Sequence, residues 1–219
     1  MTTQKKRLII ISAGAFGREV RVIASDIAAT AGASCPWEFA GFLDDRLGIL
    51  QDKNVDGARI IGDPSNYQPQ EEDLFICAIG NPSFKKQYSE IIRSKNGKFS
   101  TLIDPFSRVA SSAEIGEGTL IGPFCVVSCD LTIGADTMIP AHATIGHDVQ
   151  IGLACHIGAY AFLGGGVILG NEVTIHPHAT ILPGVTLHDK CIVGAGAVVA
   201  SDVPKGATVF EVPARRVGF

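Results

Sequence analysis

At 219 residues the chain has room for one large domain or two small ones. Hydrophobic residues make up 46% of it and charged residues 18%, so a sizeable core can be buried. The net charge is −4 and the 18 Lys and Arg residues are scattered, which excludes a basic patch for nucleic acid. No apolar run is long enough for a signal peptide or a membrane span, and we expect a soluble, cytoplasmic protein.

Strand-like and helix-like segments alternate over residues 5–103. The expected strands are Arg7–Ile11, Trp37–Leu43, Arg59–Ile61, Leu74–Ile79 and Phe99–Ile103. Helices are expected from Phe16, where apolar residues recur at spacings of four, three and four, and around Tyr88 to Ile92. This alternation predicts a small open parallel sheet with helices on its faces, a Rossmann-like α/β domain. Asp104-Pro105 marks the boundary, and we predict domains at 1–106 and 107–219.

Glycines and acidic residues follow two of these strands. Ser12-x-Gly14-x-x-Gly17 comes after the first strand, and Asp44-Asp45 ends the second. Together they form a partial dinucleotide fingerprint in which one aspartate would bind a ribose hydroxyl. About 100 residues supply half of a full dinucleotide fold, so a mononucleotide-sized ligand fits better than NAD. Two plainer interpretations remain: a tight turn, and a solvated strand end.

From residue 109 onward every sixth residue is aliphatic. The sixteen positions are Val109, Ile115, Ile121, Val127, Ile133, Ile139, Ile145, Ile151, Ile157, Leu163, Leu169, Ile175, Ile181, Leu187, Val193 and Val199. The next residue is Gly in nine hexads, and the fifth position is always Ala, Thr, Cys, Val or Leu. A helix would need spacings of three and four, and an ordinary strand a spacing of two.

Each hexad is therefore predicted to form one side of a triangular prism. Three hexads make an 18-residue coil of a parallel β-helix, and coils stack at about 4.8 Å. The aliphatic and fifth residues fill the interior, and glycine is expected to help the chain turn each corner. Three of the six cysteines occupy fifth positions, and we expect Cys125, Cys155 and Cys191 to be core residues rather than acyl-enzyme nucleophiles.

The 18-residue period also predicts which side chains lie above one another. Gly165 should lie one coil above His147, while His142 and His178 share a column with Tyr160 between them. Surface decoration and zinc binding are the competing interpretations of these histidines. A zinc site of the gamma-class carbonic anhydrase type would need further ligands, but the positions required hold Phe106 or Pro183. No metal is therefore expected.

A sheet domain followed by an uninterrupted hexapeptide array resembles the bacterial sugar O- and N-acyltransferases, which act on sialic acid or on nucleotide-linked 4-amino sugars. In the sheet domain the resemblance rests on Gly14-Ala15-Phe16-Gly17-Arg18-Glu19-Val20, Phe42-Leu43-Asp44-Asp45 and Ala78-Ile79-Gly80-Asn81. In the repeat domain it rests on His147-Asp148, His156-Ile157-Gly158-Ala159 and Val212-Pro213-Ala214-Arg215. It implies a left-handed winding, which the spacing alone does not give.

The resemblance also implies roles for individual residues. His147 would be the general base, assisted by Asp148, and no metal would be needed. The acetyl-CoA contacts implied are His156, Gly165 and Ala195. The nucleotide-sugar (UDP, dTDP or GDP) contacts implied are Gly14, Phe16, Asp44, Asp45 and Gly80. Family members are trimers with each active site between two prisms, so a homotrimer is expected.

Three residues depart from the pattern of that family. The family usually has His at the position of Phe16, Gly at that of Ser12, and Asn at that of Pro140. These positions face the sugar, so the acceptor is expected to be unusual, while the acyl-transfer residues are untouched.

The chemistry fits direct transfer from a thioester to an amine. A neutral imidazole can remove the acceptor proton, and a backbone N–H near Gly165 can stabilise the oxyanion. We therefore predict an acetyl-CoA-dependent N-acetyltransferase for a nucleotide-linked 4-amino-deoxysugar. O-acetylation of sialic acid or another sugar is the rival in the same class, and a non-catalytic β-helix scaffold is the rival in a different class.

Overall fold

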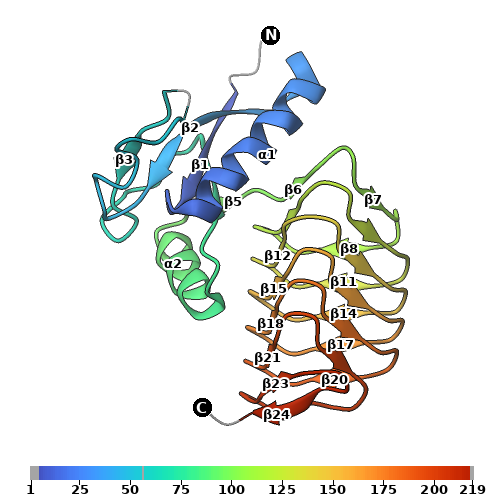
Figure 1. The fold of residues 1–219 in the computed structure, drawn as a ribbon. Coiled ribbons are helices and arrows are strands. Elements are labelled where there is room, and N and C mark those ends of the chain that lie inside the picture. The colour runs from blue at the N-terminus through green and yellow to red at the C-terminus, as the bar shows by residue number, and fades with distance from the viewer. Residues whose placement is uncertain (1–4, 56, 218–219) are drawn as a thin grey trace. The chain divides into compact units, whose positions relative to one another are not determined.

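The computed structural model describes residues 5–55 and 57–217. These residues divide into two compact units between Leu102 and Ile103 (Figure 1). Among the described residues, no helix has both the length and the apolar character needed to cross a bilayer.

The N-terminal unit contains the predicted parallel sheet. Its strands are β1 (Lys6–Ile11), β2 (Trp37–Leu43), β3 (Ile60–Gly62), β4 (Asp73–Cys77) and β5 (Lys98–Phe99). Its helices are α1 (Ala15–Ala31), the short 3-10 helix η1 (Gly32–Ser34) and α2 (Pro82–Ser94). The strand order is β3-β2-β1-β4-β5 and each neighbouring pair is parallel. The chain moves outward from β1 to β2 on one side and from β4 to β5 on the other, so right-handed crossovers place α1 and α2 on opposite faces.

Local sequence explains where the helices begin. The side chain of Asn81 accepts a hydrogen bond from the Phe84 N–H at 3.1 Å, and Pro82 occupies the first turn of α2. In α1 the apolar stripe buries Val20 and Ile23 against the sheet, as its spacing predicted. The sheet core includes Ile9, Ile11, Leu43, Phe75 and Cys77.

Two strand predictions in this half need correction. The strand expected over Leu74–Ile79 begins at Asp73 and ends at Cys77, because the chain then turns toward the cap of α2. The strand expected over Phe99–Ile103 is two short strands. The first part, β5, ends at Phe99, and β6 (Leu102–Ile103) already belongs to a sheet of the repeat region.

The C-terminal unit is a parallel β-solenoid with three sheets. The first sheet (sheet C) contains β7 (Arg108–Val109), β10 (Val126–Val127), β13 (Thr144–Ile145), β16 (Phe162–Leu163), β19 (Thr180–Ile181) and β22 (Val198–Val199). The second (sheet D) contains β8 (Glu114–Ile115), β11 (Thr132–Ile133), β14 (Gln150–Ile151), β17 (Ile168–Leu169) and β20 (Thr186–Leu187). The third (sheet B) contains β6, β9 (Leu120–Ile121), β12 (Met138–Ile139), β15 (His156–Ile157), β18 (Thr174–Ile175), β21 (Ile192–Val193), β23 (Thr208–Phe210) and β24 (Arg215–Val217).

The hexad rule correctly identifies the interior of the solenoid. From Ile121 to Val199 every aliphatic position of the hexads is at most 4% exposed. Val109 and Ile115, in the first coil, are partly buried because only one neighbouring coil covers them. The thiols of Cys125, Cys155 and Cys191 are buried as predicted.

The role predicted for the hexad glycines is wrong. From Gly118 to Gly196 the fourth residue of every hexad has a left-handed backbone at the corner, and it is often not glycine, as at Asp148 (φ 59°) and Tyr160 (φ 60°). Glycine at the second position serves close stacking instead. A Cβ on Gly152 would lie 2.5 Å from the carbonyl oxygen of Gly170 in the next coil, which is too close for any side chain.

The solenoid ends where the repeat spacing changes. Ile192 of β21 pairs with Thr208 of β23, sixteen residues on, instead of the usual eighteen. The last strand, β24, then pairs antiparallel with β23. This antiparallel strand lies at the end of sheet B and occupies the free edge of β23.

Candidate functional site

His147 and Asp148 lie together on the corner between β13 and β14. Nδ1 of His147 is 2.6 Å from Oδ2 of Asp148. The left-handed backbone of Asp148 turns its carboxylate back toward the preceding side chain, which allows two adjacent residues to pair. With Nδ1–H donating to the carboxylate, Nε2 is left as the acceptor. The side chains are 65% and 67% exposed, so Nε2 is open to an incoming group.

Gly165 lies one coil above, directly over this imidazole. A Cβ on Gly165 would be 2.6 Å from Cε1 and 2.7 Å from Nε2 of His147. The N–H of Gly166 donates to the carbonyl oxygen of His147 at 2.9 Å, which fixes the two coils relative to each other. Only glycine leaves the Nε2 edge uncovered, so the structure brings together three of the predicted site residues.

An exposed thiol that was not predicted from the sequence lies in the same column. Cys129 is exposed and lies one coil before His147, at the equivalent position of its hexad. The N–H of Asp148 donates to its carbonyl oxygen at 3.3 Å. The 18-residue period could have identified it, because 129 and 147 differ by one coil. In contrast, burial raises the pKa of the inward Cys125 and Cys191 thiols, which keeps them protonated and unreactive.

The other two predicted acetyl-CoA contacts lie elsewhere on the prism. His156 belongs to β15, in sheet B, and is partly buried. Ala195 is exposed on the corner between β21 and β22. His147 and Gly165 occupy a different corner, between sheets C and D. A single chain therefore does not gather these four residues around one point.

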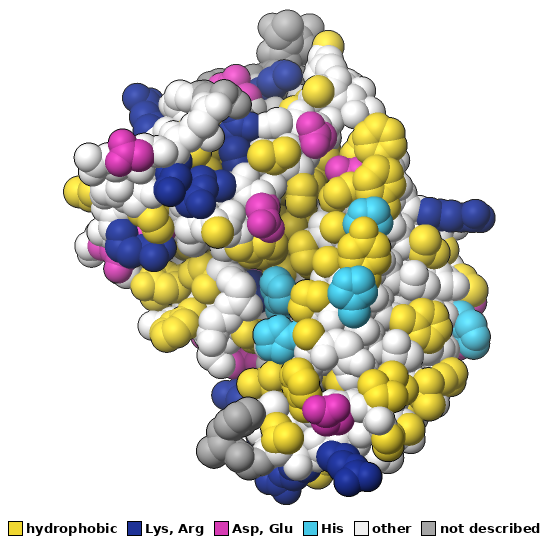
Figure 2. Space-filling model, in the orientation of Figure 1, with side chains coloured by type: hydrophobic (Ala, Val, Ile, Leu, Met, Phe, Trp, Pro, Cys, Tyr) yellow, Lys and Arg dark blue, Asp and Glu magenta, His cyan; other side chains and the backbone are white. Residues whose placement is uncertain are grey.

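The corner that carries Ala195 also carries a column of stacked rings. Ring centroids are 5.0 Å apart for Phe124 and His142, 4.5 Å for His142 and Tyr160, and 4.9 Å for Tyr160 and His178. Phe106 extends the column at 6.0 Å from Phe124. Figure 2 shows histidine side chains among hydrophobic ones on the surface of the solenoid. Within the described residues no group of His, Cys, Asp or Glu is arranged to hold a metal ion.

The N-terminal unit has a cavity of about 310 Å³ at the carboxyl ends of β1 and β2. Its position, at the point where the strand order reverses, is where open α/β sheets bind ligands. The residues around it are Ile11, Ser12, Leu43, Asp44, Asp45, Arg46, Pro64, Ile79, Phe84 and Tyr88. Apolar and aromatic side chains form one part of the cavity lining, and the three charged residues form another part.

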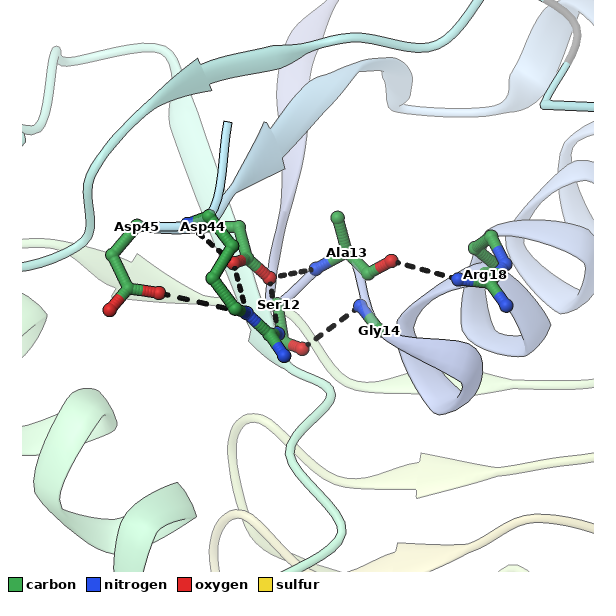
Figure 3. Close-up of polar contacts among 7 residues, drawn as sticks. Ser12, Ala13, Gly14, Arg18, Asp44 and Asp45 are labelled. Atoms are coloured by element: carbon green, nitrogen blue, oxygen red, sulfur yellow. Dashed lines mark hydrogen bonds and ion pairs between the residues drawn. The ribbon is translucent and has the colours of Figure 1, made fainter. Parts of the chain in front are cut away.

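Asp44 is a buried carboxylate with several hydrogen-bond partners (Figure 3). It accepts from the N–H of Ala13 at 2.8 Å, and from the N–H, Nε and Nη2 of Arg46 at 3.0, 2.9 and 2.9 Å. Burial alone would raise the pKa of Asp44, but the hydrogen bonds from Arg46 and Ala13 outweigh it and hold the pKa below its ordinary value. Asp44 thus organises the loop and Arg46, whereas Asp45 is 66% exposed at the cavity.

The first loop has the geometry that its glycines require. Ser12 has a φ of 82°, a left-handed conformation that glycine adopts more readily than any other residue. Its hydroxyl accepts from the N–H of Gly14 at 3.2 Å. A Cβ on Gly17 would lie 2.0 Å from the Ser12 carbonyl oxygen, so only glycine fits at this position in the first turn of α1. Phe16 is half-buried in the first turn of α1, and Gly80 has open space around its Cα.

Arg46 is a second residue whose place at a candidate site was not predicted from the sequence. Hydrogen bonding to Asp44 raises its pKa, and its Nη2 is 3.9 Å from the position of a Cβ on Gly14. The signal was present as a basic residue two positions after an aspartate at a strand end. Only the structure reveals that the guanidinium folds back over the first loop.

Comparison with known families matches both units. The model described as PglD N-terminal domain matches residues 7–92. The model described as bacterial transferase hexapeptide (six repeats) matches residues 130–165 and 166–201. No curated protein matches the chain.

Solved structures match along nearly the whole chain. A histidine variant of perosamine N-acetyltransferase from Caulobacter crescentus, in complex with CoA and GDP-perosamine, is 26% identical with a TM-score of 0.85, and the match covers 97% of each chain. The acetyltransferase domain of PglB from Neisseria gonorrhoeae, in complex with acetyl coenzyme A, is 28% identical with a TM-score of 0.87, covering 98% of this chain and 100% of that one.

The two family models together cover most of the chain, and the chain is similar over nearly its whole length to nucleotide-sugar acyltransferases. WeeI from Acinetobacter baumannii, at 24% identity and a TM-score of 0.74, shares the fold.

Proposed function

We propose that this chain is an acetyl-CoA-dependent N-acetyltransferase acting on the amino group of a nucleotide-linked 4-amino-deoxysugar. The observation that carries the proposal is the His147 imidazole, held at Nδ1 by Asp148 and lying with its Nε2 edge beneath Gly165. The relatives support the same chemistry, since their structures contain CoA or acetyl coenzyme A and, in perosamine N-acetyltransferase, GDP-perosamine as well.

In the proposed mechanism His147 acts as the general base. The acceptor nitrogen attacks the thioester carbonyl, and Nε2 of His147 takes a proton from it as the C–N bond forms. The Asp148 carboxylate favours the imidazolium that results. The backbone N–H of Gly165 would stabilise the oxyanion of the tetrahedral intermediate. Collapse then breaks the C–S bond, and the proton on His147 passes to the departing sulfur, giving amide and free CoA.

We further propose that a neighbouring subunit completes the acetyl-CoA site in a homotrimer. His147 and Gly165 lie on one corner of the prism, whereas His156 and Ala195 lie on another sheet and another corner. One bound molecule can reach all four only where the corner of one prism meets a different side of the next. In this arrangement each chain supplies the base to one site and acetyl-CoA contacts to another.

Subunit complementation tests the shared site. Ala195→Trp would block acetyl-CoA on one side of the interface, and His147→Ala would remove the base on the other. Each variant alone should be inactive. Mixed trimers should recover part of the activity, because some interfaces then contain an intact pair. Lack of recovery in mixtures that native mass spectrometry shows to contain hybrid trimers would contradict the shared site.

The cavity of the N-terminal unit is proposed to hold the nucleotide. Asp45 would bind ribose hydroxyls, the loop at Gly14 and Phe16 would lie along the phosphates and sugar, and Gly80 would leave room at the opposite wall. Asp44 would contribute by fixing the loop and Arg46.

A substrate panel tests the proposed activity. The protein is incubated with acetyl-CoA and with either sialic acid or a UDP-, dTDP- or GDP-linked 4-amino-4-deoxy sugar, and the products are identified by mass spectrometry. We expect a gain of one acetyl group on one nucleotide sugar, stable to hydroxylamine as an amide is. A hydroxylamine-labile product, or acetylation of sialic acid alone, would favour O-acetyl transfer, and failure to bind acetyl-CoA in calorimetry would favour a non-catalytic scaffold.

A further inference from the structure

Arg46 is held unusually firmly for an exposed side chain. It is 61% exposed, yet its Nε and Nη2 both bond to the buried Asp44 carboxylate at 2.9 Å. Asp45 is a second partner, 3.8 Å from Nε. An exposed arginine ordinarily samples many rotamers, and this pairing removes that freedom before any ligand binds. The guanidinium is therefore preorganised at the cavity.

The free edge of the guanidinium is available to a ligand. Asp44 engages the Nε side of the planar group, so the N–H groups of Nη1 and the second N–H of Nη2 point away from that carboxylate. Nη2 also lies 3.9 Å from the position of a Cβ on Gly14, which places the group beside the first loop. Two or three donors in one plane suit the oxygens of a phosphate.

Arg46 carries the one positive charge among the described residues that line the cavity. Asp44 and Asp45 carry the negative charges of the same lining. Removal of the guanidinium would leave two carboxylates facing the same space. A neutral nucleoside would tolerate that change, whereas a diphosphate would be repelled.

We infer that Arg46 binds the diphosphate of the nucleotide sugar and thereby selects nucleoside diphosphate-linked sugars over monophosphate-linked or free ones. Asp44 is the positioning residue that holds it. The ribose hydroxyls then lie toward Asp45, which is 3.8 Å from Nε of Arg46, and the phosphates lie toward Ser12 and Gly14 of the first loop. This inference rests on the proposed function, because it assumes that the cavity holds a nucleotide.

Calorimetric titration of uridine, UMP and UDP, with the corresponding guanosine and thymidine series, tests the inference on the full-length chain. The wild type should bind the diphosphate of its preferred base at least ~10-fold more tightly than the monophosphate. Arg46→Ala should weaken binding of the diphosphate about 10- to 100-fold, the range for losing charge-assisted hydrogen bonds, and leave the nucleoside unchanged. Arg46→Lys should recover part of the loss, because it keeps the charge without the planar pair of donors.

Two further variants serve as controls. Arg59→Ala removes an exposed positive charge of the same unit outside the cavity lining and should leave diphosphate binding unchanged. Asp44→Asn should weaken diphosphate binding less than Arg46→Ala does, and circular dichroism verifies that each variant is folded. An Arg46→Ala protein that still prefers the diphosphate to the same degree overturns the inference and leaves the proposed function standing. If the wild type binds none of these nucleotides, the proposed nucleotide site itself is overturned.

Discussion

The two units of this protein place their functional residues by different physical rules. In the solenoid, neighbours in space are eighteen residues apart in sequence, so that His147 and Gly165 meet because the coils stack. In the sheet unit, Asp44 meets Ala13 across thirty-one residues, and Arg46 meets Asp44 across only two. A repeat therefore lets geometry be calculated from spacing, whereas an open sheet brings loops together through its strand order.

This difference explains which predictions succeeded. The sixteen aliphatic positions predicted the solenoid and its core, because every coil buries residues at the same hexad positions. The alternation of strand-like and helix-like segments predicted the parallel sheet with helices on its faces, but it did not give the strand order. The burial of Asp44 and its hydrogen bonds with Arg46 and Ala13 could not be predicted, because side chains at strand ends have no periodicity and Ala13 comes from another loop.

Even in the solenoid, spacing did not predict every physical cause. The glycine at the second hexad position was expected at a corner, but it allows the close approach of coils instead. The pairing of His147 with Asp148 depends on a left-handed backbone at Asp148. The sequence alone does not predict that conformation for a residue other than glycine. The roles of His156 and Ala195 remain proposals, because they require a second subunit.

The largest effect is expected from Gly165→Ala. This substitution tests whether the 18-residue spacing stacks residue 165 directly on His147. An added methyl would lie 2.7 Å from Nε2 of His147 and push the ring aside. We expect a loss of ~100-fold in kcat, the scale of a displacement of about 1 Å at a reacting group, with little change in Tm. Leu153→Ala, on the exposed corner between β14 and β15, is a control for changes at exposed corners. Unchanged kcat in Gly165→Ala would mean that the Nε2 edge is not the reacting surface.

Ile157→Ala tests whether the solenoid core is as tightly packed as its regularity indicates. Ile157 is fully buried, so truncation should cost about 2–5 kcal/mol of unfolding free energy. Ile157→Val should cost about 0.5–1.5 kcal/mol. Chemical denaturation followed by circular dichroism measures both values. Equal, small costs would indicate a loosely packed prism.

Tyr160→Ala tests the column of stacked rings. Tyr160 stacks on His142 and His178, and each such pair is worth about 0.5–1.5 kcal/mol. Truncation should therefore lower the unfolding free energy by about 1–3 kcal/mol, visible as a lower Tm. Tyr160→Phe keeps the stacking and should match the wild type. A Phe variant as unstable as the Ala variant would mean that the hydroxyl, not the ring, is responsible.

The smallest expected effect concerns Asp44 and acid. Its pKa is lowered in the folded protein from the ordinary 3.8, so the folded state prefers the ionised form. The stabilisation is present above pH ~4 and is lost as the pH falls through the lowered pKa. Thermal unfolding of wild type and Asp44→Asn between pH 7 and 3 should show a gap in Tm that narrows only below pH ~4. A gap that is independent of pH would show that the charge of Asp44 contributes no stability.

The central claim is that His147 accepts the proton from the acceptor amine. The most direct test is single-turnover acetyl transfer by His147→Ala beside His188→Ala, which removes an exposed histidine from another corner of the solenoid. We predict that His147→Ala slows transfer by about 10²–10⁴ with acetyl-CoA binding retained, and that His188→Ala transfers at the wild-type rate. Transfer at the wild-type rate by a folded His147→Ala protein would contradict the account.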